Sequence, residues 1–311
     1  MIYDIVVLGE VNVDLILSGD VEPAWSQAEK LLDDAAFVLG GSSAIFACGA
    51  ARLGLRVGFV GVVGDDLLGR FCRDGLAAAG VDVQHVVVDA TRRTGMTVIL
   101  QRPDDRAMLT HLGTIAALER SHIPEALLTQ TRHAHVGSYW MQTALQPDLP
   151  QIFAELRRGG ATTSIDTNWD PSERWAGMEL LLGEVDMLLP NEGEALGLAR
   201  ALAGRALPID AAAELLAARV PTLVLKRGGN GALAMRGGER VAVAAPQVAF
   251  VDAVGAGDSF DAGFVYGQLS GWELARSLAL ASACGSLSCR AAGGTAAQPT
   301  LAEALALAET V

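Results

Sequence analysis

Residues 251–264, with the sequence VDAVGAGDSFDAGF, decide how this chain is interpreted. Residues 241–251 lead into this stretch and predict a strand, whereas residues 260–269 predict an apolar helix. Two glycines and an alanine therefore lie where a strand passes into a helix. Small residues at such a junction leave backbone N–H groups uncovered at the positive end of the helix, which is an environment that suits an anion.

A carboxylate, Asp258, directly follows Gly255, Ala256 and Gly257. An anion cradle beside a candidate base favours phosphoryl transfer to a hydroxyl group. The alternative is a plain connecting turn whose aspartate complements the helix dipole. Considered alone, the local pattern supports both interpretations equally.

Two better-known phosphate-binding loops do not match this stretch. Phe260 stands where the third glycine of Gly-x-Gly-x-x-Gly would be, and the chain contains no Gly-Lys-Ser/Thr. A nicotinamide-dependent oxidoreductase and a Walker-type nucleotide site are therefore not predicted.

Composition indicates a folded α/β protein. The 311 residues are 51% hydrophobic, and no linker rich in Pro, Gly or Ser divides them, so we expect a single domain over residues 1–311. The net charge of −13 argues against nucleic acid as a partner, although a local basic pocket can still bind a small anion.

The ends and the cysteines suggest a cytoplasmic protein. No signal peptide and no spanning apolar run are recognised, so no membrane is expected as a partner. The four cysteines lie in apolar or helical contexts and are predicted to be buried free thiols, with a disulfide or zinc site as the alternative: Cys48, Cys72, Cys284 and Cys289.

Strand and helix patterns alternate along most of the chain. This rhythm predicts a three-layer α/β/α sandwich around a mostly parallel sheet, with sites at the carboxyl ends of the strands. Strands are expected near residues 5–8, 57–63, 133–136, 163–166, 187–189 and 223–225, and helices near residues 148–158, 192–199, 211–218 and 273–289.

Two segments, residues 14–38 and 91–112, interrupt the rhythm with strand-like stretches. Residues 94–100 and 107–112 predict a hairpin around a turn at residues 102–106. We expect the two segments to form a small antiparallel β-lid over the strand ends, able to exclude water. Its exposed edges could pair between subunits, which predicts a homodimer.

Gly40 and Gly41 precede Ser42 and Ser43 and then a run of small apolar residues up to Gly54. The pattern predicts a glycine turn, a serine cap and a tightly packed helix with a glycine stop.

Together these motifs resemble the ribokinase-like sugar kinases, also called phosphofructokinase-B-type carbohydrate kinases. The resemblance covers essentially the whole chain and is carried, in the order of the family, by residues 40–66, 191–194 and 252–265. It implies a ribokinase-like fold and ATP- and Mg²⁺-dependent phosphorylation of a hydroxyl of a small sugar or sugar acid. A nucleoside kinase of the same fold and a catalytically inactive binding protein are the alternatives.

The resemblance implies that Asp258 is the catalytic base and that the turn of residues 255–258 is the anion hole. It implies that Asn191 and Glu194 organise Mg²⁺ through water. Their spacing of one helical turn puts both on one face, but an N-cap with its capping-box partner explains them too.

On the sugar side, the resemblance implies that Asn12 and Asp14 contact sugar hydroxyls. Gly40 and Gly41 would let the backbone approach the sugar. One departure is Ile45, which stands where the family often has an asparagine that helps to hold the sugar.

On the nucleotide side, the resemblance implies contacts from Lys226, Gly228, Gly231 and the region of Cys284. For Lys226, a solvated strand end is the alternative. Asp252 matches a position that binds a monovalent cation such as K⁺ in some members.

Three further groups have plain explanations beside functional ones. His133 and His135 alternate on a strand and lack a third metal ligand nearby, so packing is favoured. A cluster after a strand is either a turn or a substrate contact: Asp166, Asn168 and Asp170. Three arginines are either surface charges or ligands of an anionic substrate: Arg102, Arg106 and Arg174.

Overall fold

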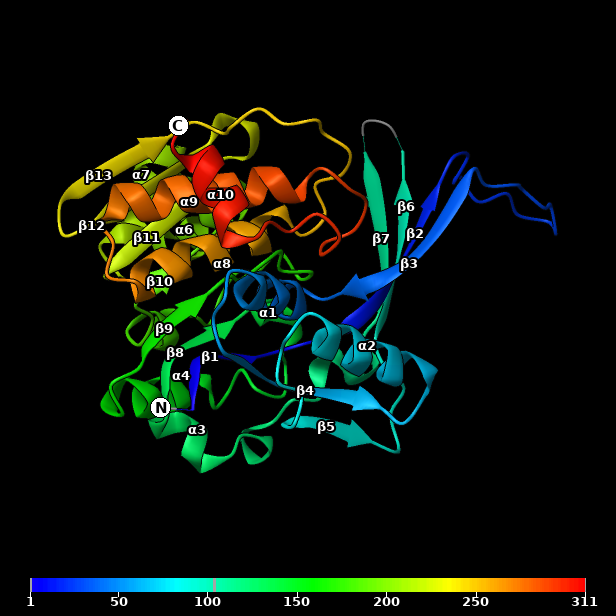
Figure 1. The fold of residues 1–311 in the computed structure, drawn as a ribbon, viewed down its shortest axis with the longest axis horizontal. Helices are drawn as coiled ribbons and strands as arrows, with labels where there is room; N and C mark the ends of the chain where they lie inside the picture. The colour runs from blue at the N-terminus through cyan, green and yellow to red at the C-terminus, as the bar shows by residue number, and fades with distance from the viewer. Residues whose placement is uncertain (1, 103–104, 311) are drawn as a thin grey trace.

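A computed structural model describes residues 2–102 and 105–310. Its centre is a nine-stranded sheet, whose place in the molecule Figure 1 shows. The strand order is β13-β12-β11-β10-β9-β8-β1-β4-β5. Seven strands run parallel: β1 (Tyr3–Leu8), β4 (Val57–Gly64), β5 (Val86–Asp89), β8 (Thr131–Val136), β9 (Thr162–Ile165), β10 (Met187–Leu188) and β11 (Thr222–Lys226). An antiparallel hairpin forms one edge: β12 (Ala232–Arg236) and β13 (Glu239–Val243).

Two apolar cores, one on each face of the sheet, produce the predicted three layers. Along β1, Val6 and Leu8 join one core while Ile5 and Val7 join the other, because successive side chains of a strand point to opposite faces. One face is covered by α1 (Ser42–Arg52), α2 (Leu67–Ala78), α8 (Ala256–Leu269), α9 (Leu274–Ser288) and α10 (Leu301–Ala308). The other is covered by α3 (Glu125–Thr129), α4 (Leu149–Arg158), α5 (Glu179–Leu182), α6 (Glu192–Ala203) and α7 (Ile209–Ala217).

A second, four-stranded sheet projects from one end of the molecule, as Figure 1 shows. Its order is β3 (Asp34–Gly40), β2 (Asn12–Ser18), β6 (Met96–Gln101) and β7 (Arg106–His111). The predicted small antiparallel sheet is present, with antiparallel pairs β2–β3 and β6–β7, but its two central strands, β2 and β6, pair in parallel. They are joined through the main body rather than by a hairpin, and a long connection permits parallel pairing. Part of the predicted turn at 102–106, residues 103 and 104, lies outside the described residues.

Around the decisive stretch, the predicted strand was too long, and the predicted helix of residues 260–269 is confirmed with an earlier start. The strand predicted over residues 241–251 ends at Val243, and Pro246, which has no N–H for a ladder, follows in an irregular segment. The helix predicted from Phe260 begins at Ala256, so Asp258 lies inside its first turn. Within the described ranges, no helix is long and apolar enough to cross a membrane.

Candidate active site

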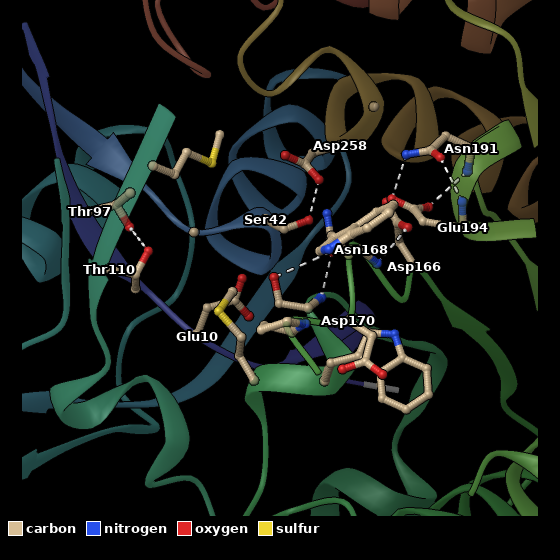
Figure 2. A pocket seen from close by; sticks show the side chains of 18 of the residues that line it. Glu10, Ser42, Thr97, Thr110, Asp166, Asn168, Asp170, Asn191, Glu194 and Asp258 are labelled. Atoms are coloured by element: carbon tan, nitrogen blue, oxygen red, sulfur yellow. Dashed lines mark hydrogen bonds between the residues drawn. The ribbon is translucent and has the colours of Figure 1, made fainter. Parts of the chain in front are cut away.

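A cavity of about 1480 Å³ opens at the carboxyl ends of the parallel strands, beside the small sheet (Figure 2). This is the edge at which doubly wound sheets place their sites. The cavity brings together predicted residues that are far apart in the sequence: Asn12, Asp14, Gly41, Asn191, Glu194, Lys226, Gly228, Gly255, Gly257 and Asp258. The motifs therefore form one site.

The turn before α8 requires glycine at position 255. Gly255 has a φ of 71°, and a Cβ there would lie 2.6 Å from the Cα of Gly294 and 2.9 Å from Cγ2 of Ile45. Both the left-handed backbone and the close approach exclude a side chain. Ile45 thus packs against the turn, which gives this departure from the family pattern a structural role.

Asp258 is buried in the first turn of α8 and lines the cavity. The Ser42 hydroxyl at the start of α1 donates a hydrogen bond to its Oδ1. Burial, reinforced by the negative charge of Asp166, raises the pKa of Asp258 to about 7, although Ser42 and Lys226 oppose the rise. A carboxyl group with a pKa near neutrality suits a general base.

The predicted serine cap of α1 was wrong, because Gly41 is the N-cap and no side chain caps this helix. The two serine hydroxyls point to carboxylates instead. Ser42 binds Asp258, and Ser43 Oγ donates to Glu10 Oε2 over 2.6 Å.

Asn191 and Glu194 form a reciprocal capping box at the start of α6. Glu194 N donates to Asn191 Oδ1 over 3.0 Å, and Asn191 N donates to Glu194 Oε2 over 2.8 Å. Both residues also line the cavity, as Figure 2 shows from close by. Burial, reinforced by Asp166, raises the pKa of Glu194. The capping interpretation is confirmed, and a role towards a metal ion is compatible with it.

Asn12 and Asp14 point to the same face of β2 and bind each other, with Asn12 Nδ2 2.8 Å from Asp14 Oδ1. A Cβ on Gly40 would lie 2.3 Å from Cγ of Asp14, so a side chain there would displace the Asp14 carboxylate. Gly41, with a φ of 93°, packs against Asn12. Burial raises the pKa of Asp14 to about 6. The pair offers amide and carboxylate groups that suit sugar hydroxyls.

A family comparison agrees with this geometry. The sequence profile of the pfkB family carbohydrate kinases matches residues 3–301. The chain belongs to this family. It is therefore a carbohydrate kinase.

Individual relatives are similar at low identity. A 5-dehydro-2-deoxygluconokinase of Geobacillus kaustophilus is 28% identical, over 85% of this chain and 83% of its own. A fructokinase of Klebsiella pneumoniae is 33% identical, over 94% of this chain and 95% of its own. The fold matches that of an Escherichia coli protein named Ribokinase II, solved with ATP and Mg²⁺, with a TM-score of 0.86, 24% identity and 99% coverage of both chains.

Lys226 of this kinase is not the solvated strand end considered above. Its ammonium group lies 2.5 Å from Asp166 Oδ2 and 3.0 Å from Asp261 Oδ2. Burial alone would lower the pKa of Lys226, but the surrounding carboxylates outweigh it and raise the pKa.

Five predicted residues do not line the cavity: Gly40, Gly231, Asp252, Ala256 and Cys284. Asp252 accepts hydrogen bonds from Val254 N and Gly293 N, each over 3.0 Å. Gly231 turns tightly against β13, and Cys284 packs against Gly263 in the α8–α9 interface. Ala256 contributes the first residue of α8. All four cysteines are free, with three of them buried.

Sequence reasoning missed a buried carboxylate at the floor of the cavity. Glu10 follows β1, and it accepts hydrogen bonds from Ser43 and from Gln142 Nε2, the latter over 2.9 Å. Burial raises its pKa. A charged residue directly after a buried strand was the signal that would have identified it.

An aromatic wall was also missed. Trp140 and Trp169 line the cavity, and both meet the buried Trp175 edge to face. Trp140 Nε1 is buried without a hydrogen-bond partner among the described residues.

The remaining candidates divide clearly. Asn168 accepts from Ser138 N over 2.8 Å, whereas Asp170 stabilises its own turn by accepting from Ser172 N and Trp175 N. Of the three arginines, Arg106 and Arg174 line the cavity, and Arg102 pairs with Glu22 away from it.

The two histidines are buried and hydrogen-bonded, as the packing interpretation predicted. His133 Nε2 and His135 Nδ1 both contact Ser164 Oγ, over 2.7 and 2.8 Å. Across residues 2–102 and 105–310, no group of three or more His, Cys, Asp and Glu side chains forms a metal-binding cluster.

Proposed function

We propose that this kinase transfers the γ-phosphoryl group of ATP to a hydroxyl group of a small sugar or sugar acid. Asp258 is the base, and the turn of residues 255–258 is the anion hole. The observation that carries the proposal is the placement of Asp258, buried in the first turn of α8 and facing the cavity that also holds the Asn12–Asp14 pair.

Asp258 accepts the proton of the attacking hydroxyl as the new O–P bond forms, while the bond from the γ-phosphorus to the bridging oxygen breaks and ADP leaves. Its pKa of about 7 allows it to be ionised before the reaction and to hold the proton afterwards. The N–H groups of Gly255, Gly257 and Asp258 stabilise the negative charge that develops on the transferring phosphoryl oxygens, whereas the Ala256 N–H already donates to Ala253 O over 3.2 Å. Asn12 and Asp14 orient the sugar towards Asp258.

The donor set at α6 fits Mg²⁺ held through water. Each Glu194 oxygen accepts one N–H from Asn191, over 2.5 and 2.8 Å, and a carboxylate oxygen has a further lone pair for a water molecule. When bound, Mg²⁺ would neutralise charge on the nucleotide phosphates. The complex of the E. coli relative with ATP and Mg²⁺ supports this cofactor pair.

Two arginines make a sugar acid a good candidate within the substrate class. Arg106 and Arg174 both line the cavity, and a guanidinium group recognises a carboxylate in bidentate fashion. Two activities are to be tested first. One is phosphorylation of 5-dehydro-2-deoxygluconate, which the name of one relative states, and the other is phosphorylation of fructose, which the name of another states.

A panel of sugars, sugar acids and nucleosides with AMP-PNP and Mg²⁺ tests the substrate. A true substrate raises the melting temperature, because a ligand stabilises the fold it binds. ADP release that depends on the same compound must accompany the shift. A nucleoside as the best ligand would contradict the sugar assignment, and binding without ADP release would indicate an inactive binding protein.

The remaining proposals concern the nucleotide, a cation and assembly. Gly228, Gly231 and the Cys284 region flank the nucleotide. Asp252 supports a monovalent cation such as K⁺. Comparing the kinase activity in a K⁺ salt with the activity in a tetraalkylammonium salt tests the cation. A cytoplasmic homodimer is also proposed. The small sheet exposes Phe37 and Leu109, which favours pairing with a second copy, and light scattering of Leu109→Lys against the wild type tests it.

A further inference from the structure

Lys226 lies at the centre of a buried charged cluster that no step of the proposed reaction uses. It ends β11, while Asp166 follows β9 and Asp261 lies in the second turn of α8. The side chains of Asp166 and Asp261 are 2% and 0% exposed, and that of Lys226 is 11% exposed. Three separate elements are therefore joined by a single ammonium group.

The fold explains how Lys226 reaches both carboxylates. In the sheet, β10 lies between β9 and β11, and β10 is only two residues long. The lysine side chain therefore extends past the end of β10 to Asp166. Two of the three ammonium protons serve the carboxylates.

The cluster connects directly to the anion turn. Asp261 is three residues after Asp258, so the two side chains lie on one side of α8. The nearest heavy atom to a Cβ built on Gly257 is Nζ of Lys226, at 3.4 Å. The ammonium group thus lies beside the backbone that is proposed to bind the phosphoryl group.

We propose that Lys226 is a positioning residue of the anion turn, which it fixes through Asp261 and supports with a positive charge beside Gly257. This inference rests on the proposed function. It differs from the nucleotide contact predicted from the sequence, because Lys226 acts through α8. The negative charge of Asp258 is stabilised by the same cation, in line with the opposing effect of Lys226 on the raised pKa of that carboxyl.

The Asp261→Asn variant separates positioning from direct contact. Asp261 is fully buried and does not line the cavity, so it touches no ligand. If Lys226 only touched phosphate, removing Asp261 would free the ammonium group and preserve phosphate binding. If Lys226 positions the turn, both Lys226→Met and Asp261→Asn weaken γ-phosphate recognition.

The experiment measures dissociation constants of Mg²⁺·AMP-PNP and Mg²⁺·ADP by calorimetry for the wild type and the variants. Their ratio reports the γ-phosphate contribution and is insensitive to a uniform loss of nucleotide affinity. We expect the preference for AMP-PNP to fall about tenfold in both variants, as the loss of one charge-assisted interaction predicts. Arg120→Met is the matched control, because Arg120 also bridges two carboxylates, Glu125 and Glu155, but lies outside the cavity.

A folded Asp261→Asn variant that keeps the wild-type preference would overturn the inference, whatever Lys226→Met does. Should Lys226→Met fail to fold, Lys226→Met/Asp261→Leu replaces it, because the double exchange keeps the net charge and leaves only Asp166, which lines the cavity, without its cation. Retained preference in the double variant also overturns the inference. A wild type that binds neither nucleotide contradicts the proposed function instead.

Discussion

The hydroxyl group of Ser42, the first residue of α1, donates a hydrogen bond to the carboxylate of Asp258 in the first turn of α8. The two residues are 216 positions apart in the sequence. Their contact joins the start of the helix that follows the Gly40–Gly41 turn to the start of the helix that follows the anion turn. The sugar side and the phosphoryl side of the cavity thus share one carboxylate.

Ser42→Ala should move the acidic limb of the pH–rate profile to higher pH. The hydrogen bond stabilises ionised Asp258, so its loss raises the pKa above about 7. A hydrogen bond to a charged group is worth about 1.5–3 kcal/mol, which corresponds to about one pH unit or more. The kcat/KM profile checks this, and Ser42→Thr, which keeps the hydroxyl, should stay near the wild type. An unchanged profile in Ser42→Ala would show that the contact does not tune Asp258.

Gly255→Ala should be far more damaging than Gly271→Ala. The two glycines have φ angles of 71° and 72°, so the backbone cost of a side chain is similar. A Cβ on Gly255 meets Gly294 and Ile45, whereas a Cβ on Gly271 meets nothing within 4 Å. We expect the free energy of unfolding in urea to fall by about 1–3 kcal/mol more for Gly255→Ala than for Gly271→Ala, which is the usual cost of overpacking. Gly255→Ala should also lose activity. Equal losses in the two variants would contradict the steric account.

The sequence predicted the three layers and the gathering of the motif residues at one edge of the sheet well. Aliphatic runs and polar residues at strand ends can be recognised from the local sequence alone. It predicted a serine cap at the start of α1, because nothing in the local sequence indicates that a carboxylate 216 positions away accepts the hydrogen bond of Ser42. The partners of Lys226, on β9 and α8, were invisible for the same reason. The parallel pairing of β2 and β6 likewise depends on how distant strands leave the main sheet.

Glu10→Ala should destabilise the fold by about 2–3 kcal/mol in chemical unfolding. It removes the acceptor of Ser43 and Gln142, and an unpaired buried polar group costs about 1–3 kcal/mol. The exposed Glu22→Ala is the control and should stay within about 0.5 kcal/mol of the wild type. A fully stable Glu10→Ala would mean that the network at the cavity floor contributes nothing to the fold.

Asp258→Asn should be more stable than the wild type above neutral pH. The folded pKa of about 7 exceeds the unfolded value of about 3.9, so the native state binds more protons between these values. The wild type therefore loses stability, relative to the variant, as pH rises from about 4 to 7. At pH 8 the variant should gain about 1–4 kcal/mol, and the difference should shrink at pH 5. Thermal unfolding at both pH values measures it, and a less stable variant at pH 8 would contradict the raised pKa.

The central claim is that Asp258 removes the proton from the substrate hydroxyl while the turn before it binds the phosphoryl group. The most direct measurement is turnover of Asp258→Asn with Mg²⁺·ATP and the sugar substrate that the panel identifies, alongside AMP-PNP binding. We predict that kcat falls by about 10²–10⁴ while AMP-PNP still binds. A folded Asp258→Asn variant that turns over at close to the wild-type rate would contradict the account.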